Sequence, residues 1–283
     1  MRDYKVVIFL MVKSNMSNSG TASIILCAPG YWKSLKEFEE ILGAFEIDLE
    51  EADDRMEGAF EASACSITRT LGKEEVSRIA SHASVAYVLS NEFLLEDCPA
   101  DAHTFLKVAR ELIRLGALGI KCESSGISHS LNRWTELADR ADLSFSEFKT
   151  TEDEELKDKY LFEFWESLFD AYTKYPISAK DLDSHYTCGM HLLGWPEVKV
   201  SLREMEEAYP DERPDLATVN LMKAFCLYLL VECHPEDMKD GQTFRITNEG
   251  PAYTLTKEPC TEYDDDDLYF NPLGYWRLSL ERG

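Results

Sequence analysis

The sequence predicts an α+β fold, with a mixed, largely antiparallel sheet, or more than one, covered by helices. Three observations lead to this prediction. Short apolar runs rich in β-branched residues alternate with longer segments whose apolar residues recur every three or four positions. Between residues 85 and 122 a strand, a helix and a strand follow one another. Near the C-terminus, residues 243–256 have the pattern of a hairpin.

The expected strands are short apolar segments that end at turn-forming residues. Residues 6–12 and 24–28, separated by a polar loop, open the fold, and small and β-branched residues suggest a further strand over 59–71. The acidic stretch 46–57 is placed on the surface. The remaining expected strands are residues 85–90, 118–122, 243–247, 252–256 and 275–280.

The expected helices carry an apolar stripe opposite a polar face. One covers residues 32–42 and ends at Gly43, and another lies between Pro99 and Gly116. A capping box over residues 151–154 begins a strongly apolar helix, and residues 76–82 and 215–233 complete the set.

The character of the chain changes at residue 150, where apolar content rises. This change predicts an N-terminal α/β subdomain over residues 1–149 and a C-terminal helical and β-hairpin subdomain over residues 150–283. Whether the two form one continuous domain stays open.

The charge is strongly acidic. The chain has 53 acidic and 29 basic residues, a formal net charge of -24 and a sequence pI near 4.6. Such a surface repels nucleic acid and anionic membranes, because proteins that bind these polyanions normally do so through Lys and Arg. Two interpretations are left: the acidity only keeps the protein soluble, or it attracts a basic protein partner.

The cysteines and the N-terminus predict a cytoplasmic protein. None of the eight cysteines belongs to a C-x-x-C pair, so buried free thiols in a reducing compartment are expected. The apolar run 6–12 is short for a secretory signal and is not followed by a small-residue cleavage site. The sequence has no run of about eighteen apolar residues, so no membrane span is predicted.

A search for catalytic motifs predicts no enzyme, no cofactor and no metal. The nucleophile elbow, the glycine-rich phosphate loops, the H-E-x-x-H motif and the EF-hand loop are all missing from the sequence. His185, Cys188 and His191 are spaced three apart, but two ligands on one side of a helix make no zinc site. The Ser128-His129-Ser130 triplet is assigned to a loop, because neighbouring residues do not face each other.

The strongest enzyme alternative is a metal-dependent nuclease. Glu197 and Lys199, in a short strand, with Asp181 or Asp183 upstream, imitate the carboxylates and lysine of such enzymes. The same pattern arises by chance on the exposed face of a strand, and the net charge opposes a nucleic-acid substrate.

Acidic and aromatic residues near the C-terminus form the preferred candidate for a binding surface. Four adjacent like charges gain nothing within a folded monomer, whereas tyrosines supply contact area to a partner. A merely solvated turn is the alternative. The first choice is Tyr263, Asp264, Asp265, Asp266, Asp267 and Tyr269, and the second choice is Glu50, Glu51, Asp53 and Asp54.

Several segments together resemble a bacterial domain of unknown function that is found beside type VI and polymorphic toxins. The matching segments are residues 6–12, 81–88, 115–120, 187–198 and 241–247. The resemblance implies an α+β protein without catalytic residues that acts as an immunity protein, or antitoxin, against a type VI effector, with a basic nuclease domain as the natural partner. A further hypothesis for the function is a secretion adaptor or scaffold.

Overall fold

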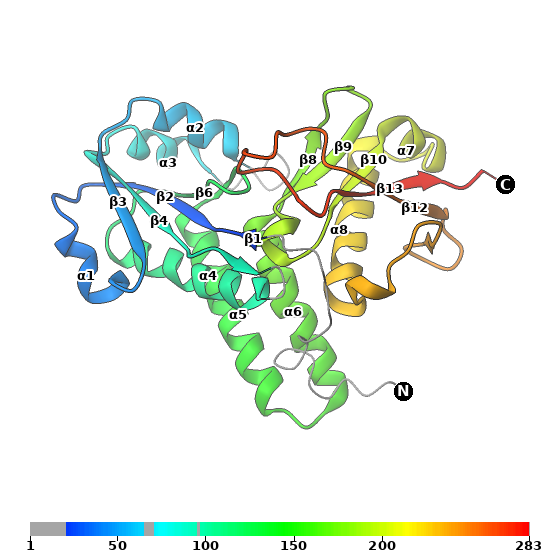
Figure 1. Cartoon of the computed structure of the whole chain (residues 1–283), viewed down its shortest axis with the longest axis horizontal. Helices are drawn as coiled ribbons and strands as arrows, with labels where there is room; N and C mark the ends of the chain where they lie inside the picture. The colour runs from blue at the N-terminus through cyan, green and yellow to red at the C-terminus, as the bar shows by residue number, and fades with distance from the viewer. Residues whose placement is uncertain (1–20, 65–70, 95–96, 283) are drawn as a thin grey trace.

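The computed structural model describes residues 21–64, 71–94 and 97–282. Within them it contains eight α-helices and thirteen strands, and the predicted α+β class with largely antiparallel sheets is confirmed. Figure 1 shows two sheets side by side, with a long helical hairpin that extends away from both.

The first sheet has five strands, and all neighbouring strands are antiparallel. Side chains alternate between its two faces, as the strand period requires. Leu26 and Val88 point to the face that packs on α4, whereas Cys27 and Val85 contact α2 and α3 on the other face. The strands, in spatial order, are β3 (Glu46–Glu51), β4 (Ser84–Leu89), β2 (Ile25–Gly30), β6 (Ile120–Cys122) and β7 (Ile127–His129).

The second sheet has six strands, and only its β10–β13 pair is parallel. Val198 and Leu278 point to the face covered by α8, where they share the main core with Phe225. Residues 259–274, between the last two strands, cover the opposite face. In spatial order the strands are β11 (Thr243–Phe244), β12 (Tyr253–Glu258), β13 (Tyr275–Leu280), β10 (Glu197–Ser201), β9 (Ser184–Cys188) and β8 (Lys174–Ser178).

The helices join the two sheets into one body. The hairpin of α5 (Leu131–Thr150) and α6 (Glu154–Tyr172) packs on α4 (Cys98–Arg114) and α8 (Pro214–Glu232), and one continuous apolar core runs through all four. This core crosses the expected boundary at residue 150. The smaller elements are α1 (Lys36–Leu42), α2 (Met56–Ser63), α3 (Lys73–Ile79), α7 (Leu202–Ala208), β1 (Thr21–Ala22), β5 (Phe93–Leu94) and the 3₁₀ turns η1 (Met190–Leu193) and η2 (Pro235–Asp237).

Most expected elements inside the described residues are confirmed, and four details are wrong. The strand expected from residue 59 is helix α2, since Met56, Phe60 and Ser63 are buried at helical spacing. The triplet around His129 is not a loop but the end of β7 followed by the N-cap of α5, a helix that is absent from the sequence-based prediction. Helix α6 is capped by Asp153, not by residue 151. The acidic stretch 46–57 is exposed as expected, but includes edge strand β3. The expected strand 6–12 and residues 65–70 lie outside the described residues.

Helix α8 is long and apolar enough to cross a membrane by length and composition, with a mean hydropathy of 1.3, although no membrane span is predicted from the sequence. Half of its 18-residue window is buried within the protein. Leu221, Phe225 and Leu229 lie in the core shared with α6 and the six-stranded sheet. Helix α8 therefore packs as a core helix of this fold.

Candidate binding site

Four consecutive aspartates lie in the connection between β12 and β13, residues 259–274, here called the acidic loop. It crosses the face of the six-stranded sheet opposite α8 and reaches the first sheet (Figure 1). The Tyr269 hydroxyl lies against the β6–β7 turn at Gly126, where a Cβ would be only 3.0 Å from the phenol oxygen. The loop therefore lies at the junction of the two sheets.

Glu262 fixes the first end of the acidic loop to the sheet. Its Oε1 lies 3.3 Å from Lys199 Nζ on β10, and its Oε2 accepts a hydrogen bond of 3.1 Å from the backbone nitrogen of Lys180. Both charged side chains are buried. A buried charge is tolerated only when it is paired, so this contact ties the loop to β10.

A tyrosine cluster holds the loop next to this anchor. The hydroxyls of Tyr263 and Tyr186 are 2.7 Å apart, and the rings of Tyr263 and Tyr269 meet edge to face at 5.3 Å between centroids. Burial raises the pKa of Tyr186 to about 12, so the phenol is neutral at physiological pH. Tyr263 and Tyr269, expected on the binding surface, are half-buried and anchor the loop.

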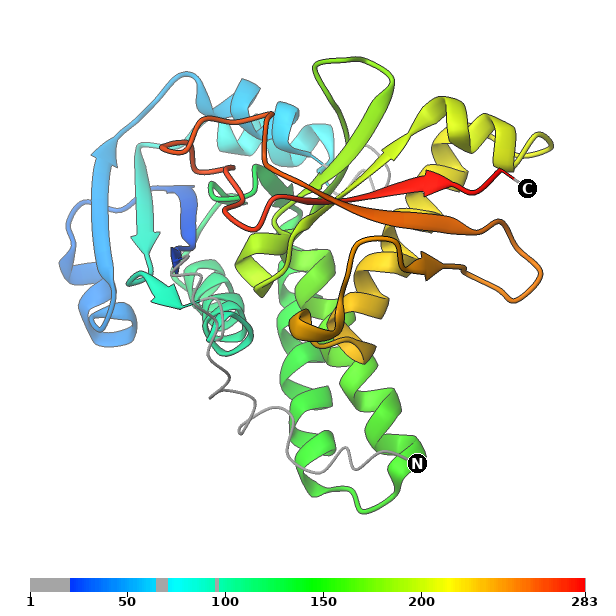
Figure 2. The same ribbon diagram turned by 45° about the vertical axis from the view of Figure 1, so that its right-hand side comes forward.

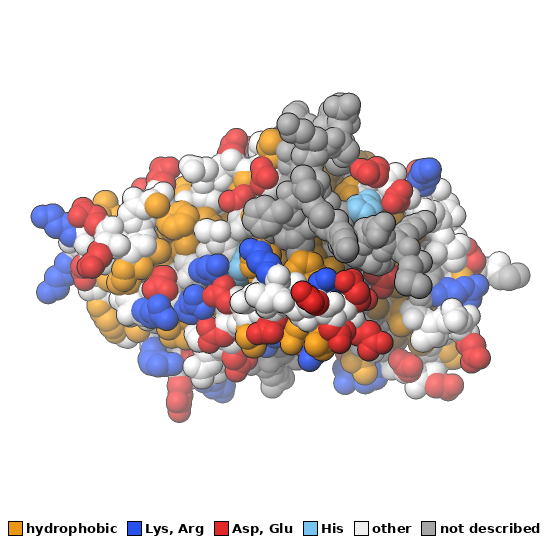
Figure 3. Space-filling model, turned by 90° about the horizontal axis from the view of Figure 1, so that it is seen from below, with side chains coloured by type: hydrophobic (Ala, Val, Ile, Leu, Met, Phe, Trp, Pro, Cys, Tyr) orange, Lys and Arg blue, Asp and Glu red, His pale blue; other side chains and the backbone are white. Residues whose placement is uncertain are grey.

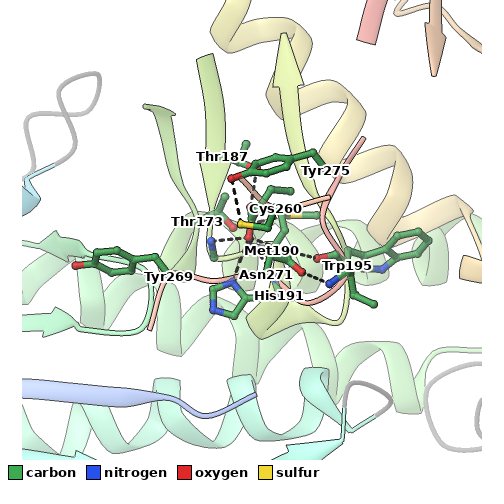
Figure 4. A network of polar contacts seen from close by, with 12 residues as sticks. Thr173, Thr187, Met190, His191, Trp195, Cys260, Tyr269, Asn271 and Tyr275 are labelled. Carbon is green, nitrogen blue, oxygen red and sulfur yellow. Dashed lines mark hydrogen bonds and ion pairs between the residues drawn. The ribbon is translucent and has the colours of Figure 1, made fainter. Parts of the chain in front are cut away.

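Asn271 fixes the second end of the loop. Its Nδ2 donates to the carbonyl oxygen of Trp195 at 2.9 Å and to Glu197 Oε1 at 3.1 Å. Its Oδ1 accepts from the backbone nitrogen of Leu273 at 2.8 Å. Asn271 is fully buried, and Figure 4 shows it pointing into a network of polar contacts between β9, η1 and the loop.

Glu197 is the centre of that network. Its carboxylate accepts from the Thr187 hydroxyl at 2.7 Å and contacts His191 Nδ1 at 3.1 Å. The backbone nitrogens of Gly189, Met190 and His191 also donate to it. With Asn271, six protein groups surround this buried carboxylate. Its oxygens serve to hold η1 and the acidic loop together.

Between the two anchors, the loop exposes four consecutive aspartates, Asp264–Asp267, here called the acidic turn. Asp267 Oδ1 accepts a hydrogen bond of 2.9 Å from the backbone nitrogen of Tyr269. The carboxylates of Asp264, Asp265 and Asp266 make no hydrogen bond or ion pair within the described part of the chain. Three unpaired negative charges thus project from a backbone fixed on both sides.

The acidic residues of the helices are in a different situation. Arg133 pairs with Asp170 at 2.8 Å, and Arg140 pairs with Glu166 at 2.6 Å. Figure 3 shows red and blue side chains interspersed over the face around the end of the α5–α6 hairpin. These helix carboxylates are therefore paired with cations, whereas the carboxylates of Asp264, Asp265 and Asp266 are not.

The second-choice residues differ in exposure and in their partners. Glu50 and Glu51 belong to edge strand β3 and are exposed, as is Asp54. Asp53 is occupied by Arg55, whose Nη2 lies 2.7 Å from Asp53 Oδ2. Hydrogen bonds from Arg55 lower the pKa of Asp53 to about 2. The negative charge of Asp53 is therefore already paired with the positive charge of Arg55.

The residues weighed and rejected above as catalytic or metal-binding groups lie apart in the structure. His185 and Cys188 lie on strand β9, three residues apart and thus on opposite faces, and not on a helix. No group of three or more His, Cys, Asp or Glu side chains at metal-binding spacing occurs among the described residues. The Ser128 hydroxyl contacts Ser63 Oγ at 2.8 Å, and His129 Nε2 contacts the Ala171 carbonyl at 3.2 Å, so each has a different partner.

The nuclease-like residues are likewise separated. Glu197 and Lys199 lie on a strand as predicted, but both are buried and not on an exposed face. Asp183 accepts from the Ser201 hydroxyl at 2.9 Å, at the far end of β10 from Glu197. Asp181 binds the backbone and hydroxyl of Ser184. These acidic groups have no common centre.

Comparison of the chain with protein-family models, with curated proteins and with solved structures finds no match.

Proposed function

We propose that this protein binds a basic protein partner through the acidic turn. The observation that carries the proposal is the contrast within the loop: residues 262, 263, 269 and 271 are anchored by buried contacts, while Asp264, Asp265 and Asp266 remain exposed and unpaired. Adjacent like charges repel one another, and a cation placed beside them offsets this repulsion. Binding of a cationic partner is therefore favoured.

The fixed backbone makes this turn suited to recognition. A loop that is already ordered loses little conformational freedom on binding, so more of the interaction energy contributes to affinity. The net charge adds long-range attraction, which accelerates association by roughly 10- to 1,000-fold and is weakened by salt.

More specifically, we propose that the protein is a cytoplasmic immunity protein that neutralises a basic nuclease toxin. Two considerations support this step: the resemblance of the chain to proteins found beside type VI toxins, and the chemistry of nucleases. Nucleases bind polyanions through basic clefts, and an acidic, preorganised turn fits such a cleft. Occupation of the cleft would prevent the toxin from binding nucleic acid.

The first experiment measures how the acidic turn contributes to association. The variant Asp264→Asn/Asp265→Asn/Asp266→Asn removes three charges and preserves Asp267, whose carboxylate orders the turn. Its matched control, Glu152→Gln/Glu155→Gln/Asp158→Asn, removes three exposed charges at the end of the α5–α6 hairpin. Stopped-flow association with the protein encoded by the neighbouring gene should slow by about tenfold at low salt for the loop variant only. Equal rates for the two variants would rule out the acidic turn as the steering site.

A second experiment tests neutralisation itself. Co-expression of this chain should restore growth to cells that carry the neighbouring gene, and the two proteins should co-purify. A neighbouring gene product that stays toxic, or that does not co-purify, argues against an immunity role and leaves the loop experiment to be repeated with other basic proteins.

A further inference from the structure

We propose that the free edge of β3 accepts an extended, basic peptide segment as an additional strand of the five-stranded sheet. This is a second binding surface, on a different sheet from the acidic turn, and it does not depend on the function proposed above. An unpaired sheet edge offers a row of backbone donors and acceptors, and strand addition is an established mode of peptide recognition.

The other sheet edges in the described part of the chain are blocked. Strand β7 has three residues, and its outer side is occupied by a bridge between Ala64 and Ser128. Strand β8 contains Pro176 and a register shift between Lys174 and Ile177. Strand β11 has two residues, as have β1 and β5. Shortness, proline and irregular register are the usual ways in which proteins prevent strand addition.

Strand β3 has none of these protections. It runs for six residues in regular antiparallel register with β4, from Glu46 opposite Leu89 to Glu51 opposite Ser84. Figures 1 and 2 both show β3 at one end of the molecule, with no other described strand beside its free edge and with helix α1 and the connection leading to it close by. An incoming segment would therefore not have to displace a described strand.

The side chains of β3 specify the chemistry of that segment. Glu46, Asp48 and Glu50 occupy alternate positions, so they form a row on one face with about 7 Å between successive carboxylates. All three are exposed, and none of their carboxylates forms an ion pair or hydrogen bond with another described residue. Ile47 and Leu49 point to the other face, toward the main core. A strand with Lys or Arg at alternate positions would place a cation opposite each carboxylate.

The same row argues against a second copy of the chain as the occupant. Two β3 edges paired with each other would bring carboxylates face to face, and like charges directly opposite in a sheet are destabilising. The acidic row therefore excludes self-association and selects a cationic strand.

The test uses a nine-residue probe peptide with Lys at alternate positions and Thr or Val between them. Binding is measured by fluorescence anisotropy with three proteins: the native chain, Glu46→Gln/Asp48→Asn/Glu50→Gln, and the acidic-turn variant Asp264→Asn/Asp265→Asn/Asp266→Asn. The β3 variant should bind at least about fivefold more weakly, because three cross-strand ion pairs are lost. The acidic-turn variant should bind as the native chain does.

A second probe separates strand addition from charge attraction alone. The same peptide with methylated backbone nitrogens keeps its lysines and cannot donate to β3, so its binding should fall at least tenfold. In amide hydrogen exchange, residues 46–51 should gain protection with the unmodified peptide only. Equal binding of the methylated peptide, unchanged protection, or equal loss in the two protein variants would each overturn the proposal.

Discussion

Lys199 and Glu262, 63 residues apart in the sequence, form a buried ion pair in which 9% and 7% of the two side chains are exposed. This pair joins the central strand of the six-stranded sheet to the acidic loop. We predict that Lys199→Met destabilises the protein by about 3–5 kcal/mol, because it leaves Glu262 buried without a cation. Urea unfolding monitored by circular dichroism measures the change.

The matched control is the exposed pair of Arg282 and Glu207, whose charged atoms are 2.9 Å apart. Arg282→Met should cost less than about 1 kcal/mol, since exposed ion pairs contribute little. The double variant Lys199→Met/Glu262→Leu should be more stable than Lys199→Met, because no unpaired charge remains. A Lys199→Met protein as stable as Arg282→Met would contradict the burial of this pair.

Gly189 is predicted to be the glycine least tolerant of substitution. Its φ of +119° lies in a region that L-residues rarely adopt, and a Cβ would stand 2.0 Å from the Tyr172 carbonyl oxygen. Gly189→Ala should cost more than about 3 kcal/mol, by strain and by displacement of the network around Glu197. Gly241 also has a positive φ, of +80°, but nothing lies within 4 Å of its Cβ position. Gly241→Ala should therefore cost only about 1–2 kcal/mol, and equal losses in thermal unfolding would refute the close approach.

The bounds of a strand or helix could be predicted where the local sequence pattern marks its ends. Strand β13 was predicted with its observed bounds, and α4 within one residue, because Pro99 and Gly116 mark its two ends. Helix α5 was missed although Trp134, Leu137, Ala138 and Ala141 recur at helical spacing. The polar residues between them obscured that stripe.

The site was harder to predict, because its contacts are between residues distant in the sequence. The sequence pattern around Glu197 suggests an exposed residue or a metal ligand. Nothing near it in the sequence indicates that Asn271, 74 residues later, donates to its carboxylate. The exposure of the acidic turn follows from its composition, whereas the anchoring roles of Tyr263 and Tyr269 follow only from the tertiary structure.

His129 should make stability fall in mild acid. It is buried against Trp134, and burial lowers its pKa from 6.5 to about 4. The unfolded chain therefore binds a proton near pH 6.5 that the folded chain does not bind until about pH 4. The stabilisation is complete above pH 6.5 and decreases by about 3 kcal/mol as the pH falls to 4.

The comparison of the native protein with His129→Gln isolates this contribution from that of other titrating groups. Unfolding free energies are measured in urea at intervals between pH 7 and pH 4. The stability difference between the two proteins should shrink by about 3 kcal/mol over this interval, because glutamine does not titrate. Parallel curves would show that His129 keeps an ordinary pKa.

Asn271→Asp should be strongly destabilising at neutral pH. The substitution replaces an amide donor, 3.1 Å from Glu197 Oε1, with a second carboxylate in a buried site. Two carboxylates at this distance cannot both be ionised without a large penalty, so one must take up a proton and its pKa rises. We expect a loss of about 2–5 kcal/mol at pH 7, from the missing hydrogen bond and the buried like charges.

The sign of the pH dependence distinguishes this mechanism from a simple packing defect. A carboxyl whose pKa is raised in the folded state takes up its proton more readily there than in the unfolded chain, so the variant should recover stability, relative to the native protein, as the pH is lowered from 7 to 5. Asn132→Asp is the matched control, since Asn132 is exposed in the first turn of α5, where a negative charge is favourable. It should change stability by less than about 1 kcal/mol. If the deficit of Asn271→Asp stays constant between pH 7 and 5, the amide of Asn271 does not face the carboxylate of Glu197, and the second anchor of the acidic loop must be sought elsewhere.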